Sequence, residues 1–596
     1  MATKKPLRWK SRRAAAERTP QIRLLSLEFT PQNMSAPLPG TAATATIDLP
    51  DLTSYPAPID KAIRLLQAGA AIEHALLIQY LYAGYGFSPE NRDILNIAIE
   101  EMSHLMTVQN LLLLVGAQPD LSRQDFGTPD GDEERLFPFD LMLEPVTHES
   151  LAKYVVAESP KDSPTGVDPQ LMDRIVQNAL QGSGASINRV GTLYALLGAV
   201  FGSEQLLLQK AATGDAWYVM VNALAAEAAL EYGGRDRLHL PDIAFVPAPM
   251  VHQGTDREWD RSVVNAGLDE FRVHVSSSRE QALEALRDIG LQGEGPSTAA
   301  TELAHFIRFL NLYKQFYGPD GTGTGPAPHA AAVPSAAKIF IDEQSADPQV
   351  ISHPETARWA RLANHRYGIL LGTLEMYLRL PAPDRQFLLG WCFAEMFALK
   401  KLSNYLTKKP RTSQVGPNVG AVPFTLPAWT GHAVTWDDLE GEFSAAAAEV
   451  AAIQAGPGNS DDQKRVLGHL ASSDLHKLAE VQARKLAGTV RRKVDRAREI
   501  LDWAAGAGDP RHLGDSPEYL DQDQGRFWNL ALADLKQVSI AGTNIWNPPG
   551  PGQDAPLIRM LRLGFMPRNR PPLATTDPEF MFLEDWVRNQ CPDEPA

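Results

Sequence analysis

Two stretches near the start of the chain carry apolar residues at helical spacing. Residues 59–87 contain no proline, and apolar side chains such as Leu65 and Tyr80 recur near one stripe. Residues 97–115 are apolar at most positions, and the last five are all leucine or valine. Apolar positions three and four residues apart are typical of a helix with one buried face. The short segment at 84–91, with its glycines and a proline, separates the two stretches, so we expect a pair of antiparallel helices.

Charged residues interrupt both apolar stretches. The second stretch contains the tetrapeptide Glu101-Met-Ser-His104, and the first carries Glu73 between alanine, isoleucine and leucine residues. Residues three apart share one helix face, so Glu101 and His104 point the same way. Burying an ion costs several kcal/mol unless it has a partner, and a metal ion can satisfy a carboxylate and an imidazole together. The alternative is a His–Glu pair inside an ordinary helical bundle.

A second Glu-x-x-His tetrapeptide, Glu302-Leu-Ala-His305, occurs much later in the chain and is also followed by apolar residues. Helical bundles that hold two metal ions take a Glu from each of two helices and a Glu-x-x-His from each of the other two. The repeat of the tetrapeptide therefore favours a two-metal site over an isolated ion pair. The ligands that this pattern predicts are Glu73, Glu101, His104, Glu302 and His305.

Prolines and glycines divide the predicted helices into regions. We expect an all-α fold in which a helical bundle is followed by a second helical region and an irregular C-terminal tail. The expected regions are an N-terminal arm (1–57), the bundle (58–316) with an insertion at about 119–278, a linker (317–345), the second helical region (346–507) and the tail (508–596). Within the arm, residues 22–29 could form a strand. Within the tail, residues 580–587 should form a short helix that docks on the body of the protein.

Composition limits the class of protein. The chain has 596 residues, which is too many for a single core, and a net charge of −16, which argues against nucleic acid as a partner. Two cysteines, Cys392 and Cys591, cannot build a disulfide framework or a zinc-thiolate site alone. No apolar run approaches the roughly 18 residues that span a bilayer, and the basic N-terminal segment has no apolar core behind it. We therefore expect a cytoplasmic protein that binds neither membranes nor nucleic acid.

Other candidate chemistry is weaker. His365, Glu375 and Glu395 lie in predicted helices but lack the paired spacing of ligands. His74 follows Glu73 directly and so points about 100° away from it on a helix, which favours a structural or supporting role. The sequence contains no glycine-rich phosphate loop, no Gly-x-Ser-x-Gly and no Cys–His dyad.

Several motifs resemble the ferritin-like domain of the iminophenyl-pyruvate dimer synthase family. This domain also occurs in the large synthases that join two indole-pyruvate imines in the violacein and rebeccamycin pathways. The motifs are Ala71-Ile-Glu-His-Ala75, Glu100-Glu-Met-Ser-His104, Gln292-Gly-Glu-Gly295 and Glu302-Leu-Ala-His-Phe-Ile-Arg-Phe309. The likeness runs from about residue 58 to 315 and is weaker through 358–426.

This resemblance implies a ferritin-like helical bundle with iron-type ligands at Glu73, Glu101, His104, Glu294 and His305. Glu302 falls at a more variable position of the motif. The chain departs from the family at Val190-Gly-Thr192-Leu-Tyr194, where Gly-Glu-Leu/Phe-Tyr is expected, and Thr192 cannot replace a carboxylate ligand. Either Glu294 supplies the carboxylate of the third helix, or one metal position is weakened.

Carboxylates with few imidazoles suit iron, with manganese as the alternative, and the pattern predicts two ions. The leading hypothesis is a non-heme diiron-type oxidase or oxygenase of secondary metabolism that acts on an amino-acid-derived small molecule. Its partners would be that substrate, dioxygen and an electron donor, and assembly into a homo-oligomer is left open. One alternative is oxidative coupling of two imines, as the family name suggests. Another is a metal-binding or scaffold protein without turnover.

Overall fold

The computed structural model describes most of the helical chain and short pieces of its termini. Its residues fall into two compact units, Met1–Phe245 with His252–Asp474, and Val246–Val251 with Leu475–Ala596. The described residues are 8–9, 21–24, 27–29, 49–52, 55–87, 90–123, 138–139, 141–159, 167–183, 186–187, 189–245, 252–255, 258–259, 271–294, 304–380, 385–414, 416–430, 433–489, 497–498, 500–501, 536, 539–540, 543–547, 554–562 and 578–589.

The first unit is built around an antiparallel pair of long helices, α1 (Pro58–Tyr85) and α2 (Arg92–Leu114). Proline at the first position of α1 fits a helix start, because the missing N–H would have no partner there. The side chain of Asn91 accepts a hydrogen bond from the backbone N–H of Ile94 and so caps α2. Where the pair packs closely, a Cβ at Gly84 would come within 2.7 Å of Leu95. The antiparallel helical pair expected from the sequence is therefore confirmed.

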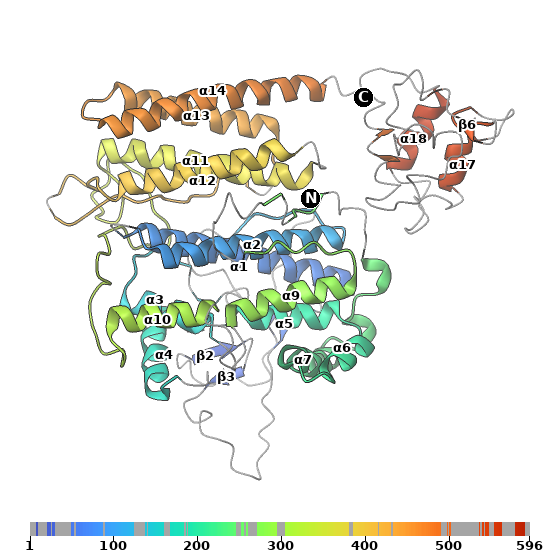
Figure 1. The fold of residues 1–596 in the computed structure, drawn as a ribbon, viewed down its shortest axis with the longest axis horizontal. Helices are drawn as coiled ribbons and strands as arrows, with labels where there is room; N and C mark the ends of the chain where they lie inside the picture. The colour runs from blue at the N-terminus through green and yellow to red at the C-terminus, as the bar shows by residue number, and fades with distance from the viewer. Residues whose placement is uncertain are drawn as a thin grey trace, which may run out of the picture. The chain divides into compact units, whose positions relative to one another are not determined.

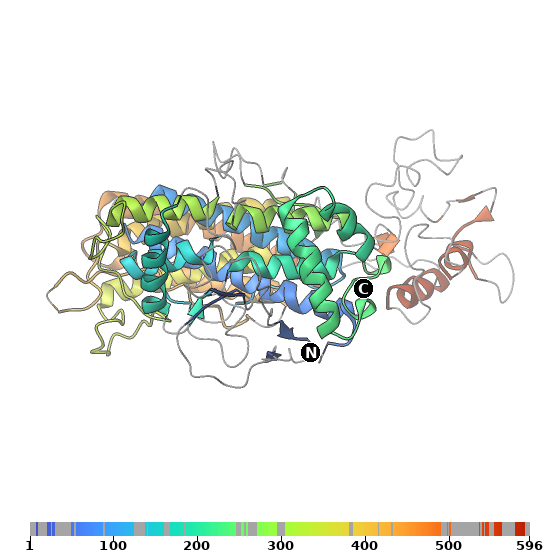
Figure 2. The ribbon, with the colours of Figure 1, turned by 90° about the horizontal axis from the view of Figure 1, so that it is seen from below.

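The other two sides of the bundle each consist of two shorter helices. One side has α3 (His148–Ala157) and α5 (Val190–Phe201), and the other has α9 (Arg279–Glu294) and α10 (His305–Tyr317). Figures 1 and 2 both show α10 and α9 following one another along one side. Helix α5 packs on α1 and α9, and α3 packs on α10. Four helix ends therefore meet alongside the middle of α1 and α2.

Smaller helices surround this bundle. The helix α4 (Pro169–Ser183) packs on α3, whereas α6 (Glu204–Ala211) and α7 (Ala216–Glu231) form a pair beside α5. Two 3-10 turns, η3 (Arg235–Arg237) and η4 (Asp242–Ala244), follow α7. The stretch at 119–278 that we expected as an insertion thus contributes α3 and α5 to the bundle itself.

A further set of helices packs on the α1 and α2 side of the bundle (Figure 1). It comprises α11 (Pro354–Arg379), α12 (Gln386–Leu406), α13 (Trp436–Ala455) and the start of α14 (Asp461–Thr489). Helices α11 to α14 fall within residues 346–507, where we expected a second helical region. The segment at 317–345 that we expected to link two domains lies inside the first unit, where Leu143 bridges to Ala336 and Ile341 to Ile351.

Strands are few and short in the described residues. β1 (Arg8–Trp9) pairs antiparallel with β4 (Pro50–Asp51), and β2 (Gln21–Leu24) lies between β3 (Leu27–Phe29) and β5 (Ser186–Ile187). The single strand expected at 22–29 is instead two short strands, β2 and β3, which pair antiparallel. These pieces do not alter the all-α class of the fold.

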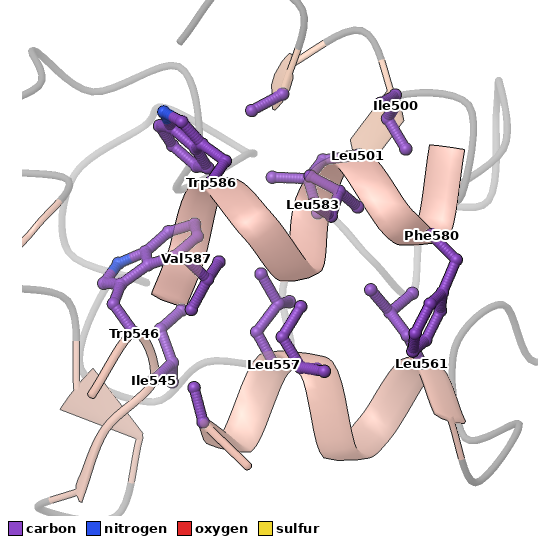
Figure 3. Packing of buried hydrophobic residues seen from close by; sticks show 13 residues of the cluster. Ile500, Leu501, Ile545, Trp546, Leu557, Leu561, Phe580, Leu583, Trp586 and Val587 are labelled. Atoms are coloured by element: carbon purple, nitrogen blue, oxygen red, sulfur yellow. The ribbon is translucent and has the colours of Figure 1, made fainter. Parts of the chain in front are cut away.

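The second unit has a hydrophobic core of its own (Figure 3). Helices α17 (Pro556–Arg562) and α18 (Pro578–Arg588) pack together, and the rings of Trp546 and Trp586 meet edge to face at 5.6 Å. A two-strand hairpin, β6 (Ser539–Ile540) and β7 (Thr543–Asn544), precedes them. The expected helix at 580–587 is confirmed as part of α18. Its buried side chains belong to one hydrophobic cluster with Ile500, Leu501 and other residues of this unit.

A buried ion cluster holds three helices of the second helical region together. The guanidinium of Arg366 on α11 binds both carboxylate oxygens of Asp474 on α14, one at 2.6 Å, and lies 3.5 Å from Glu395 on α12. All three side chains are almost inaccessible to solvent. Removing the guanidinium of Arg366 would leave the buried carboxylates of Asp474 and Glu395 without a positive partner. An uncompensated buried charge strongly destabilises the folded state.

We predict that Arg366→Met lowers the free energy of unfolding by about 3–5 kcal/mol. Arg361→Met is the matched control. Arg361 lies on the same helix as Arg366 and also pairs with two carboxylates, those of Glu343 and Glu449, but its side chain is 35% exposed. The control should cost about 1 kcal/mol or less. Urea denaturation of the two variants checks this, and equal losses would contradict the role given to the buried cluster.

Candidate metal centre

The first group of candidate ligands joins α1 and α2. Nδ1 of His104 lies 2.9 Å from Glu101 Oε2 and 3.6 Å from Glu73 Oε2. Glu101 and His104 are one helical turn apart, and α1 runs antiparallel beside them, so Glu73 faces both. All three side chains are buried, and one ligand atom of each lies within 4.8 Å of the others. The structure thus brings together three of the residues predicted from the sequence.

The second group shares Glu101 with the first. Nδ1 of His305 lies 2.9 Å from Glu101 Oε1 and 3.9 Å from Oε2 of Glu158. Glu101 therefore presents one carboxylate oxygen to each group, and the imidazole rings of His104 and His305 are 5.5 Å apart. A carboxylate placed between two sets of ligands is the arrangement that two adjacent metal ions require.

Several polar atoms in the two groups have no hydrogen bond within the described part of the chain. They are Glu73 Oε2, Glu101 Oε1 and His305 Nδ1, and each is buried. Buried polar atoms without partners are rare, and each calls for an explanation such as an ion. Because they belong to ligand-type residues that face one another, the donor set fits a pair of oxygen- and nitrogen-coordinated cations.

Two phenols hold the outer carboxylates. Tyr194 on α5 donates its hydroxyl to Glu73 Oε1, and Tyr80 on α1 donates its hydroxyl to Glu158 Oε1 at 2.7 Å. Each terminal carboxylate therefore has one oxygen fixed by a tyrosine and the other turned toward an imidazole. Hydrogen bonds of this kind orient carboxylate ligands and are a regular feature of metal sites.

The two imidazoles are anchored through their far nitrogens. Nε2 of His104 lies 2.8 Å from Oε1 of Gln292 in the last turn of α9, and Nε2 of His305 lies 3.0 Å from Oε2 of Glu100. Because carboxylate and amide oxygens accept, each Nε2 donates its proton outward. Both Nδ1 atoms then point at the carboxylates, so Nδ1 is the nitrogen of each ring that would bind a metal ion after losing its proton.

Protonation of the metal-free site follows from burial and crowding. Burial raises the pKa of Glu73 to about 7. The hydrogen bond from His104 acts to lower this pKa, and repulsion from Glu101 acts to raise it further. Burial and repulsion from Glu101 likewise raise the pKa of Glu158 to about 7. Burial alone would lower the pKa of His305, but the charges of Glu101 and Glu100 raise it to about 10. The metal-free site therefore holds protons where cations could sit.

Glu101 behaves in the opposite way. Its burial acts to raise the pKa, but the facing imidazoles of His305 and His104 hold the pKa well below the usual range. The shared carboxylate is thus charged in the metal-free protein, whereas each of the outer two is about half protonated at pH 7. A shared ligand that stays ionised is ready to bind cations on both sides.

Two predicted ligands cannot be compared with the structure. Glu294 is the last residue of α9, and its side chain lies outside the described residues, as does Glu302 entirely. The described helix α10 begins at His305. Thr192 is half-buried on α5, two positions and hence about 200° from Tyr194. At this place α5 thus offers the site a phenol rather than the carboxylate that the family pattern led us to expect.

The remaining candidates are engaged elsewhere. His74 donates from Nδ1 to the carbonyl of Leu121 and accepts at Nε2 from the hydroxyl of Tyr367, at 2.9 and 2.7 Å. Burial and the nearby charge of Arg123 lower the pKa of His74 to about 3, so it is a neutral structural link between α1 and α11. His365 pairs with Glu442, and Glu375 accepts from the backbone of Val434. As expected from spacing, they are not part of the candidate centre.

Sequence reasoning missed two residues of the site, Glu158 and Glu100. Glu158 caps the C-terminal end of α3, where a carboxylate is unfavourable next to the helix dipole. This misplaced charge after Val155-Val156-Ala157 was the available signal, although a weak one. Glu100 stands beside Glu101 in the quoted motif, and nothing in the spacing separated its role from that of its neighbour.

Parts of the chain are similar to known proteins. Residues 66–228 match the ferritin-like family. The chain is 27% identical over 177 residues to dichlorochromopyrrolate synthase from Lentzea aerocolonigenes, a match that covers 24% of this chain and 17% of that enzyme. A solved ferritin-like protein from Caulobacter vibrioides is 16% identical and matches 58% of this chain and 96% of its own, with a TM-score of 0.31.

The family match begins within α1 and takes in α2, α3 and α5. These elements carry Glu73, Glu101, His104 and Glu158. The part of the all-α bundle that carries these four residues is therefore ferritin-like.

Proposed function

We propose that this chain is a non-heme, dinuclear-iron oxidase or oxygenase of secondary metabolism that acts on an amino-acid-derived small molecule. The ions would be held by Glu73 and His104 on one side and by Glu158 and His305 on the other, with Glu101 between them. Glu294 and Glu302 stay predicted ligands from the sequence. Manganese is the alternative metal.

The observation that carries this proposal is that three buried ligand atoms without hydrogen bonds gather in the two groups around Glu101. His305 Nδ1 and Glu101 Oε1 lie 2.9 Å apart without the alignment of a hydrogen bond, whereas a purely structural ion pair would be aligned. Three carboxylates also leave part of the charge of two divalent ions unbalanced. A further anionic ligand from the chain, the solvent or the substrate would complete the balance.

A pair of iron ions held there would supply reductive activation of dioxygen for the oxidation of a nearby organic molecule. The protein's own contribution is positioning. The phenols of Tyr194 and Tyr80 each hold one oxygen of an outer carboxylate and leave the other oxygen facing an imidazole. The apolar packing of α1 and α2 keeps bulk water away from the ligands.

A second candidate is the oxidative coupling of two imines derived from amino acids. The similarity to an enzyme named dichlorochromopyrrolate synthase favours it. Because this chain matches only 17% of that enzyme's length, the shared part concerns the bundle rather than the whole reaction. An assay for this candidate would need an amino-acid oxidase to supply the imine.

Metal content tests the ligand assignment. We expect the purified chain to bind about two irons, and Glu101→Ala to lose both because both groups need this carboxylate. Glu73→Ala and Glu158→Ala should each leave about one ion, since each removes a ligand of one group only. Iron analysis by plasma emission after anaerobic loading checks this.

The matched control for these variants is Glu375→Ala, which removes a buried glutamate of the second helical region. It should keep the full iron content. If Glu101→Ala still loads as much iron as the control, the assignment of the shared ligand is wrong.

The pH dependence of stability gives an independent test. Glu73 and Glu158 keep their protons to about pH 7 in the folded chain, whereas an ordinary glutamate has lost its proton above 4.5. His305 keeps its proton to about pH 10 rather than 6.5. For each of these groups the folded chain binds a proton over a pH range in which the unfolded chain has lost it. The contribution of the site to the free energy of unfolding of the metal-free chain therefore falls as the pH rises from 4.5 to 10.

Metal ions must displace these protons, so binding is favoured as the pH rises. We therefore expect the increase in melting temperature caused by Fe(II) or Mn(II) to be larger at pH 8 than at pH 6. Calorimetry with and without metal measures it. An increase that is independent of pH would contradict displacement of protons at the site.

Turnover separates an enzyme from a scaffold. The ferrous chain should consume dioxygen faster than its Glu101→Ala variant, and addition of the true substrate should raise the rate further. An oxygen electrode follows this directly. A loaded chain that consumes no dioxygen with reductant and a panel of amino-acid-derived substrates would favour a metal-binding scaffold instead.

A further inference from the structure

The two imidazoles of the site differ in what holds their far nitrogens. Nε2 of His305 donates to the carboxylate of Glu100 at 3.0 Å, whereas Nε2 of His104 donates to the amide oxygen of Gln292 at 2.8 Å. One acceptor can carry a negative charge and the other is neutral. The two ligand groups are therefore chemically unequal just outside the ligands themselves.

The charge on Glu100 is secured by its surroundings. Its side chain is fully buried, and Nη1 of Arg308 lies 2.7 Å from each of its carboxylate oxygens. Arg308 is on α10 one turn after His305, so the imidazole and the guanidinium approach the same carboxylate from one helix. This guanidinium keeps Glu100 an anion and leaves an oxygen in place for the proton of His305.

Gln292 provides nothing equivalent. It lies in the last turn of α9 and is partly exposed to solvent. Its amide oxygen orients the ring of His104 but brings no negative charge to it.

The carboxylate side of the two groups does not offset this difference. Glu73 and Glu158 each receive one phenol hydrogen bond, from Tyr194 and Tyr80. The contrast between the two groups thus lies in the partners of the imidazoles.

A hydrogen bond from a metal-bound imidazole to a carboxylate makes the ring a stronger donor to the metal, and such outer contacts change affinity by about 10- to 100-fold. We propose that the two metal positions are inequivalent: the position at Glu101, Glu158 and His305 binds its ion first and more tightly, with Glu100 as the positioning residue. This inference rests on the proposed dinuclear centre. It assigns the position at Glu73 and His104 to the more weakly held, exchangeable ion.

The test is a titration of the metal-free, full-length chain with Co(II), followed by its visible absorption and by calorimetry. The wild-type chain should bind in two separated steps. Glu100→Gln replaces the anion by the same amide that His104 contacts, and should weaken the first step by about 10- to 100-fold while leaving the second in place. Gln292→Glu, the reciprocal change, should tighten the second step and bring the two together.

Glu144→Gln is the matched control. Glu144 is also a largely buried carboxylate paired with a cation, Lys153, and it belongs to neither ligand group. It should leave both steps unchanged, so that an effect of Glu100→Gln cannot be ascribed to general loss of a buried ion pair. If Glu100→Gln fails to fold, Gln292→Glu still decides the matter.

The outcomes separate this inference from the proposed function. A wild-type chain that binds no Co(II) overturns both. Two ions bound with equal affinity, or a first step that is insensitive to Glu100→Gln while Gln292→Glu leaves the gap unchanged, overturns the inequivalence alone. A selective loss of the first step, with a narrowed gap in Gln292→Glu, supports it.

Discussion

The burial of several acidic and basic side chains in one apolar bundle is the constraint on which the site depends. Glu73, Glu101 and Glu158 cannot all be ionised side by side without positive charge between them. In the metal-free protein, protons supply that charge, as the raised pKa values of the outer carboxylates and of His305 indicate. Cations at the same places would do so without leaving buried atoms unpaired. The same side chains are thus poor stabilisers and good ligands.

Helix ends are what deliver these side chains to one place. α3 ends at Glu158 and α10 starts at His305, whereas Tyr194 and Gln292 lie near the facing ends of α5 and α9. Uninterrupted α1 and α2 provide the rigid half of the site, with Glu73 on one helix and Glu101 and His104 on the other. Sites built partly on long helices hold their ligands accurately. The other two sides of the bundle, which consist of α3 with α5 and α9 with α10, contribute residues from four separate segments.

The sequence could predict the continuous half of the site and not the broken half. Glu73, Glu101 and His104 are found from helical spacing because they lie within long regular helices. His305 was found through its tetrapeptide, although the described helix starts only at His305 itself. Glu158 depends on where α3 ends and how it packs against α10, which are tertiary facts without a local pattern. The partners Glu100 and Gln292 are likewise set by packing between α2, α9 and α10.

Helices α11 and α12 contact the bundle from the side of α1 that carries His74, as in the hydrogen bond between His74 and Tyr367. The central claim is that two cations share Glu101. Crystals grown with Fe(II) under anaerobic conditions and measured at the iron absorption edge test it most directly. Two anomalous peaks about 3.5–4 Å apart, one beside His104 and one beside His305, are predicted. An edge map without density next to Glu101, or with iron only at surface carboxylates, would contradict the account.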